Sequence, residues 1–370
     1  MGDTARMFAE RRGGWPAAVI MLVACAFVFI ALCWAGSPKV YGFVGPGHGG
    51  PGSMSEPPFN PNAWHKVEGD VLSIDDVWGR RVKPRGVFEI PGGVGVMYNS
   101  KPPGGYEDGA RDQTGSLAFS RNLVEWKDYP GNPVMYEVQE WQGSYRAMPR
   151  GMMYDEANKQ WVVYFGDSHG DYPGIRAVGT AYSTDLVNWT YEDGPTITID
   201  DYVAAVPERI EATEQEQADE GRVYAEWAIN HKGRYYVRVS GTNVTGENRR
   251  YGSLLLAADA PGGPFSHFEE FEGDLIPETR PVYWEGKWYT AITSTWDGQA
   301  GIGLAVADDL MGPYEENPEN PIFPIETTSR TRPQLFRYGG VWAVLYCHTY
   351  DLNNMTLRIA ISDVHPDIIP

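Results

Sequence analysis

Two short patterns recur five times along the chain with nearly the same irregular spacing. The first is a small residue, an apolar alternation and a closing Ser or Asp, at Ser120, Ser183, Asp259, Asp308 and Asp363. The second opens a predicted strand, with marker residues Arg85, Arg150, Glu226, Arg280 and Arg332. Successive copies are 63, 76, 49 and 55 residues apart for the first pattern, and 65, 76, 54 and 52 for the second. Two independently chosen patterns thus keep one period, which indicates a structural repeat.

Repeats of this length with about three or four short strands each are typical of β-propeller blades. The chain has 13 Trp, 22 Tyr and 13 Phe with 43 Gly and 28 Pro, a mixture that suits short strands and tight turns. No long segment has helical periodicity; residues 207–222 are polar nearly all round and are interpreted as a surface insertion. We predict an all-β, five-bladed β-propeller over residues 64–370. A β-sandwich is the alternative, although it does not require five copies.

The fifth copy ends at Asp363, and only seven residues follow it. Blade five therefore lacks an outer strand of its own. Residues 64–80 precede the first blade, so we predict that they supply this strand and close the ring.

The N-terminal region predicts export. Residues 17–35 contain no charge, and nineteen residues of helix span roughly 28 Å, close to the thickness of a bilayer core. Arg6, Arg11 and Arg12 precede this run and orient the later residues outward.

Three fates of this run stay open: cleavage after Ala35, lipoprotein-type cleavage before Cys25, or retention as a membrane anchor. We assign residues 1–36 to a cytoplasmic stub with a signal peptide or signal-anchor helix. The Gly/Pro-rich residues 37–63 are a predicted flexible linker. The protein is thus expected outside the cytoplasm, anchored or secreted.

Charge and cysteine content exclude several functions. The formal net charge of −19 argues against nucleic acid as a partner. The three cysteines, Cys25, Cys33 and Cys347, form neither a disulfide framework in the folded part nor a metal-binding spacing. GxSxG, P-loop and HExxH motifs are absent from the sequence. The oligomeric state is not predicted.

Residues 181–193, 257–270 and 305–322 carry Ser-x-Asp-Leu-x-x-Trp and Gly-Pro-aromatic turns. These turns resemble those of the five-bladed propeller glycoside hydrolases of families 43, 32, 62, 68, 117 and 130. The resemblance covers nearly all of residues 64–370 and leaves the family open. Six-bladed sialidase-type propellers carry similar turns.

The resemblance to family 43 implies three carboxylates on the inner strands: a base in blade one, an orienting carboxylate in blade three and a general acid in blade four. Glu226 matches the orienting position, and Glu278 lies one residue out of register with the acid. Blade one has no Asp at the expected position, so Asp76 is the assigned base. Asp75, Asp112 and Asp167 are alternatives for that role.

Four of the five predicted inner strands begin with an arginine: Arg85, Arg150, Arg280 and Arg332. In a propeller these guanidinium groups converge, and converging like charges need a negative partner. That partner is either the carboxylate pair Glu226 and Glu278 or an anionic substrate. The alternative is that each arginine pairs with a loop of the neighbouring blade.

Two further residues are assigned roles. Trp227 is a candidate for stacking on a sugar ring. His348 is a candidate ligand for a structural calcium ion on the propeller axis, as the resemblance implies, and no cofactor is required for catalysis.

The predicted function is glycoside hydrolysis of an extracellular polysaccharide, anionic if the arginines face the substrate, by paired carboxylates in the axial pocket. The alternatives are a non-catalytic glycan-binding propeller and a family-130-like glycoside phosphorylase. The export signal argues against the phosphorylase, because that reaction relies on cytoplasmic phosphate.

Overall fold

The computed structural model divides the chain into two units, Met1–Val40 and Tyr41–Pro370, and all described residues lie in the second. It describes residues 60–72, 80–101, 114–137, 139, 141, 148–166, 177–198, 201–202, 222–242, 252–265, 267–271, 273, 275–327, 331–350 and 355–362.

The described residues form five antiparallel sheets, one for each repeat. Blade one has β2 (Arg80–Ile90), β3 (Gly93–Lys101), β4 (Thr114–Ser120) and β5 (Trp126–Asp128). Blade two has β6 (Pro149–Asp155), β7 (Gln160–Phe165), β8 (Ala177–Ser183), β9 (Thr190–Tyr191) and β10 (Ile197–Thr198). Blade three has β11 (Arg222–His231), β12 (Arg234–Thr242), β13 (Gly252–Ala258) and β14 (His267–Glu270).

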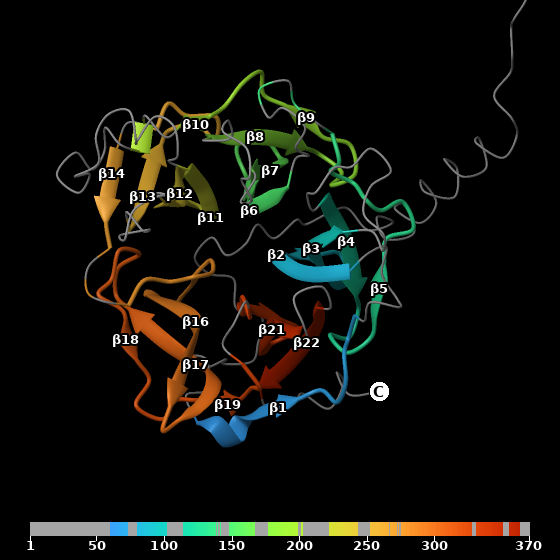
Figure 1. Ribbon diagram of the computed structural model, residues 1–370, viewed down its shortest axis with the longest axis vertical. Helices are drawn as coiled ribbons and strands as arrows, with labels where there is room; N and C mark the ends of the chain where they lie inside the picture. The colour runs from blue at the N-terminus through green and yellow to red at the C-terminus, as the bar shows by residue number, and fades with distance from the viewer. Residues whose placement is uncertain are drawn as a thin grey trace, which may run out of the picture. The chain divides into compact units, whose positions relative to one another are not determined.

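Blade four has β15 (Val282–Trp284), β16 (Lys287–Trp296), β17 (Gln299–Ala307), β18 (Glu315–Glu316) and β19 (Phe323–Pro324). Blade five has β20 (Gln334–Tyr338), β21 (Val341–Thr349), β22 (Met355–Ser362) and β1 (Trp64–Lys66). The sheets surround one axis, with β2, β6 and β11 near it (Figure 1). The five-bladed propeller is confirmed.

The ring closes through its first strand. β1 pairs antiparallel with β22, with Trp64 opposite Ser362, so the fourth strand of blade five comes from the other end of the fold. A short 3₁₀-helix (Pro61–Ala63), capped by the side chain of Asn60, leads into β1. The predicted closure is confirmed, and it joins the two ends of the propeller by backbone hydrogen bonds.

The Ser-x-Asp-Leu-x-x-Trp turns form as their sequence dictates. After β4, the side chain of Asn122 accepts two backbone N–H groups at 3.1 and 2.8 Å, and the indole of Trp126 donates to the Leu123 carbonyl at 2.8 Å. Leu123 has φ of 67° at the point where the chain reverses. The turn after β8 makes the same contacts through Asp185, Leu186 and Trp189. These local bonds explain why the motif marks the third strand of a blade.

Apolar clusters between neighbouring blades hold the ring together. One joins blades two and three, another blades three and four, a third blades four and five, and a fourth blades five and one. Gly151, next to the marker residue of blade two, allows a close approach: a Cβ there would lie 2.9 Å from the backbone of Trp227 in blade three. The inner strands therefore pack tightly around the axis.

Within the part of the chain that the structure describes, no helix is long and apolar enough to cross a membrane. Residues 17–35 lie outside that part, so the predicted signal or anchor helix stays a prediction.

Truncation of Trp64 tests the closure. Trp64 is 6% exposed and packs in the cluster between blades four and five, so Trp64→Ala is expected to lower the free energy of unfolding by about 3–5 kcal/mol. His65→Ala, on the exposed side of the same strand, should change it by less than about 0.5 kcal/mol. Urea unfolding measures both, and equal effects would contradict this role of β1.

Candidate active site

Strand bulges place three of the marker residues. The inner strands β2, β6 and β11 each lose register with the neighbouring strand at one point. The extra residues at those points are Arg85, Arg150 and Glu226. A bulge removes a residue from the ladder and redirects its side chain. The repeated marker is therefore a repeated device that turns one side chain per strand out of the sheet.

The two Thr-Arg-Pro segments meet each other ahead of β15 and β20. The buried hydroxyl of Thr279 donates to the carbonyl of Pro333 in the second segment at 2.6 Å. Arg332, in that second segment, has φ of 48°, which a side chain rarely adopts without compensation. Its Nη1 donates to Oε2 of Glu226 at 2.8 Å, across from blade five to blade three.

Glu226 is an ionised, buried carboxylate. Its side chain is 7% exposed. Burial by itself raises the pKa of Glu226, but Arg332, Arg238, Arg150 and Arg85 together lower it below the ordinary value of 4.5. The field of Glu226 in turn raises the pKa of Arg332. Glu226 is therefore negative at neutral pH, as an orienting carboxylate requires.

Arg85 and Arg150 lie on either side of this charge in a dry environment. Arg85 is 8% exposed and Arg150 is 3% exposed. Burial, with the positive fields of Arg150 and Arg332, lowers the pKa of Arg85 well below its ordinary value. The buried Nε of Arg85 has no hydrogen-bond partner among the described residues. Arg150 lies 5.3 Å over the ring of Tyr224. Arg85 is thus a buried cation with unused donor capacity.

Arg238 joins the same group and was missed by the sequence analysis. It lies on β12, opposite Trp227, is 7% exposed and donates from Nη2 to Ser253 at 2.8 Å. Burial lowers the pKa of Arg238, while Glu226 opposes this effect. A charged residue at an inward position of the apolar alternation was the available signal. We call Arg85, Arg150, Arg238, Arg332 and Glu226 the axial cluster.

Glu278 borders the axial cluster from an exposed position. Its negative field acts on both Arg238 and Arg332. The two candidate carboxylates, Glu226 and Glu278, therefore share Arg332, one buried beside it and the other open to solvent.

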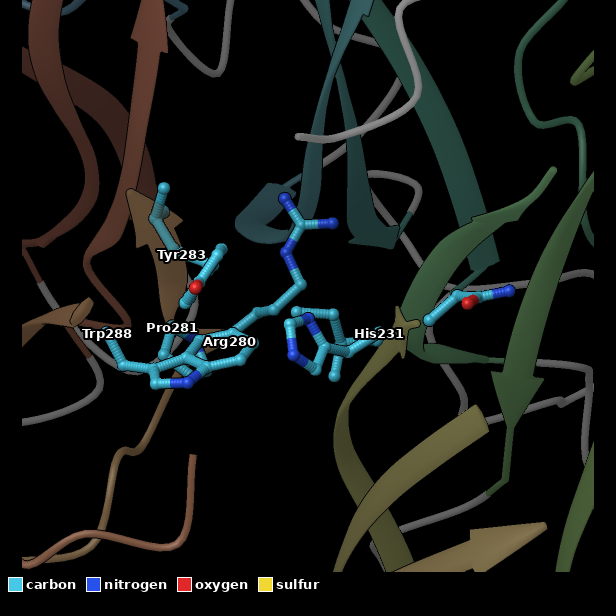
Figure 2. Close-up of a pocket in the computed structure, with 8 residues that line it drawn as sticks. His231, Arg280, Pro281, Tyr283 and Trp288 are labelled. Carbon is cyan, nitrogen blue, oxygen red and sulfur yellow. The ribbon is translucent and has the colours of Figure 1, made fainter. Parts of the chain in front are cut away.

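Arg280 lies apart from the axial cluster. Its Nη2 donates to the Val87 carbonyl on β2 at 3.3 Å. Figure 2 shows its side chain extending away from Trp288, near His231, toward the strands of blade one. Burial lowers the pKa of Arg280 to about 9, so the group stays charged at neutral pH. The structure thus brings three of the four predicted arginines together, and the fourth crosses the axis to another blade.

Trp227 is buried at 2% exposed, and its indole donates to the Pro277 carbonyl at 2.9 Å. A ring in this position is closed to a sugar and instead supports the residue that precedes Glu278.

His348 is 8% exposed, and its Nδ1 lies 3.1 Å from Oε2 of Glu326. No group of three or more metal-binding side chains occurs within the described ranges. The calcium ion therefore stays a prediction.

The remaining acidic candidates, Asp75, Asp76, Asp112 and Asp167, lie outside the described residues. The base assigned to blade one has no structural placement.

Comparison with known proteins supports the fold. No protein-family profile matches the sequence, and no characterised protein sequence matches it significantly. Among solved structures, a complex of BT0996 and RGII superposes with a TM-score of 0.53 at 13% identity, covering 80% of this protein and 92% of the other. A structure described as "Glycoside hydrolase" superposes with a TM-score of 0.51 at 12% identity, covering 81% and 93%. The protein therefore shares the propeller fold of these structures.

The ionised state of Glu226 predicts an acid-sensitive stability. Its folded pKa is lowered, so the stabilisation it provides is present above the ordinary value of 4.5 and is lost as pH falls through the folded pKa. At neutral pH, Glu226→Gln should cost about 3–5 kcal/mol, because it leaves Arg332 without its buried partner. Below about pH 4 the difference from wild type should shrink.

Denaturant unfolding across this pH range measures the effect. Glu156→Gln is the control, because it removes an exposed ion pair with Lys159 and should change stability by less than about 1 kcal/mol. A difference between wild type and Glu226→Gln that stays constant down to pH 3 would contradict an ionised Glu226.

Proposed function

We propose that the protein is a glycoside hydrolase that cleaves an anionic polysaccharide or oligosaccharide in the axial pocket. The carrying observation is the axial cluster: guanidinium groups from four blades surround one buried carboxylate, with a second carboxylate at the edge. The propeller fold, shared with a structure described as a glycoside hydrolase, agrees with this proposal.

Charge balance supports an anionic substrate. Four arginines of the axial cluster face two carboxylates, Glu226 and Glu278, among the described residues. A uronate, sulfate or phosphate group on the sugar would supply the missing negative charge, and a guanidinium can hold it with two hydrogen bonds. The protein carries a net charge of −19 overall, so this cationic pocket is a local exception.

The proposed roles follow from exposure. Glu278 can approach a leaving-group oxygen and is assigned as general acid; a sugar ring over it excludes water, which favours a protonated carboxyl. Glu226 is fixed by Arg332 and is assigned as the orienting carboxylate. Asp76 stays the assigned base.

The proposed setting is extracytoplasmic. The uncharged run 17–35 would carry the propeller out of the cytoplasm and either tether it to the membrane or be removed. The partners are then a glycan and, in the tethered form, the membrane.

Glycan binding without catalysis is the second candidate. The favouring observation is that the buried carboxylate is already neutralised by Arg332, which leaves Glu278 as the one exposed acid assigned to the described part of the site. In this case the pocket would hold an anionic sugar and release nothing.

A screen of acidic and neutral polysaccharides for released reducing sugar tests hydrolysis. Glu278→Gln should lower kcat by at least about 100-fold and leave substrate binding within about threefold, because the amide cannot donate a proton to the leaving oxygen. Glu285→Gln is the matched control, an exposed glutamate of the same blade in the turn between β15 and β16. Undiminished turnover by Glu278→Gln would reject the assigned acid, whereas binding without product in wild type would favour the second candidate. Turnover that requires added phosphate would instead identify a phosphorylase.

Replacement of Arg85 separates a substrate-binding role from a structural one. If Arg85 awaits an anion, Arg85→Met removes a buried, repelled cation and should raise the free energy of unfolding by about 1 kcal/mol or more. The same change should weaken binding of an anionic glycan by about 10-fold or more and leave a neutral glycan unaffected. Lower stability with unchanged binding would show that Arg85 joins the blades instead.

A further inference from the structure

An exposed tyrosine stands on the rim of blade five, at the end of β21. Tyr350 is 58% exposed, and Tyr136 is the other large apolar side chain with comparable exposure in the described part of the chain. An exposed aromatic ring usually moves freely among rotamers, so a ring that is held in place calls for an explanation.

The hydroxyl of Tyr350 is held from two sides. It donates to Oδ2 of Asp70 at 3.0 Å and accepts from Nη2 of Arg358 at 3.2 Å. The ring of His348 meets the ring of Tyr350 edge-on, with centroids 4.4 Å apart and planes at 86°. One end of the tyrosine is therefore fixed by hydrogen bonds and one side of its ring by packing.

The residues that hold Tyr350 also hold each other. Arg358 contacts Asp70 at 2.9 Å through Nε and Glu326 at 3.1 Å through Nη1. The other oxygen of Glu326 lies 3.1 Å from Nδ1 of His348. The contacts thus close a loop of five side chains, the Tyr350 network, which consists of Asp70, Glu326, His348, Tyr350 and Arg358.

The Tyr350 network lies on the same edge of blade five as the axial cluster. The N–H of Cys347 donates to the Thr331 carbonyl at 2.7 Å, next to Arg332. Tyr350 follows Cys347 by three positions, or roughly 10 Å of extended chain. A glycan that enters the axial pocket and continues over blade five would meet this ring.

We infer that Tyr350 is a stacking platform for a sugar ring of the substrate at a subsite remote from the bond that is cleaved. The inference rests on the proposed function. The apolar C–H face of a pyranose or furanose ring fits an exposed phenol ring, and a ring already held in place loses little entropy on binding. Asp70, Glu326, His348 and Arg358 are positioning residues, which act through Tyr350.

The length of the oligosaccharide provides the test. The probes are short and long galacturonate and glucuronate oligosaccharides, together with any anionic oligosaccharides released in the polysaccharide screen. Tyr350→Ala should raise KM or Kd for the long probes about 3- to 10-fold and leave the shortest probes much less affected. Tyr350→Phe keeps the ring and should recover most of the loss. Tyr136→Ala, the matched exposed tyrosine, should have no effect.

The outcomes separate this inference from the proposed function. If Tyr350→Ala binds long and short probes as wild type does while Glu278→Gln is inactive, the platform is wrong and the hydrolase stands. If Tyr350→Ala unfolds more easily and loses affinity equally at every length, the network has a purely structural role. If wild-type protein binds none of the probes, both proposals fail.

Discussion

The site depends on the electrostatic match between Glu226 and the guanidinium groups around it. Four cations from four blades would repel one another in a buried space, and the ionised carboxylate of Glu226 offsets part of that repulsion. The bulges in β2, β6 and β11 fix this arrangement, because each turns one residue out of its ladder. The apolar clusters between the blades stabilise the ring that keeps these charges close.

One carboxylate does not neutralise four arginines, and this surplus connects the fold to its proposed function. The surplus is stable only because the charges lie on strands that the rest of the ring holds in place. Arg85, buried with an unpartnered Nε, is the clearest sign that the pocket is prepared for a group it does not contain itself. The Tyr350 network extends the same idea to the rim, where a fixed aromatic ring is offered to the continuing chain of the substrate.

The blade count could be predicted from sequence because its signals are local. Asn122 and Asp185 each build a turn from bonds to residues next in the chain, so the motif and its structure are inseparable. The arginines were harder. Arg280 and Arg332 share the same Thr-Arg-Pro context, yet only Arg332 takes a positive φ and reaches Glu226. Arg238 comes from a second strand, and Trp227 is covered by the neighbouring loop; both depend on packing between blades that no short pattern records.

The central claim, that the axial cluster binds the negative charge of a sugar, is tested most directly by chemical neutralisation of that charge. Isothermal titration calorimetry of the Glu278→Gln variant would compare a uronate oligosaccharide with the same oligosaccharide after its carboxylates are reduced to alcohols. The account predicts that the anionic form binds at least about tenfold more tightly and that the preference falls as salt is added. Equal affinity for the two forms would contradict it.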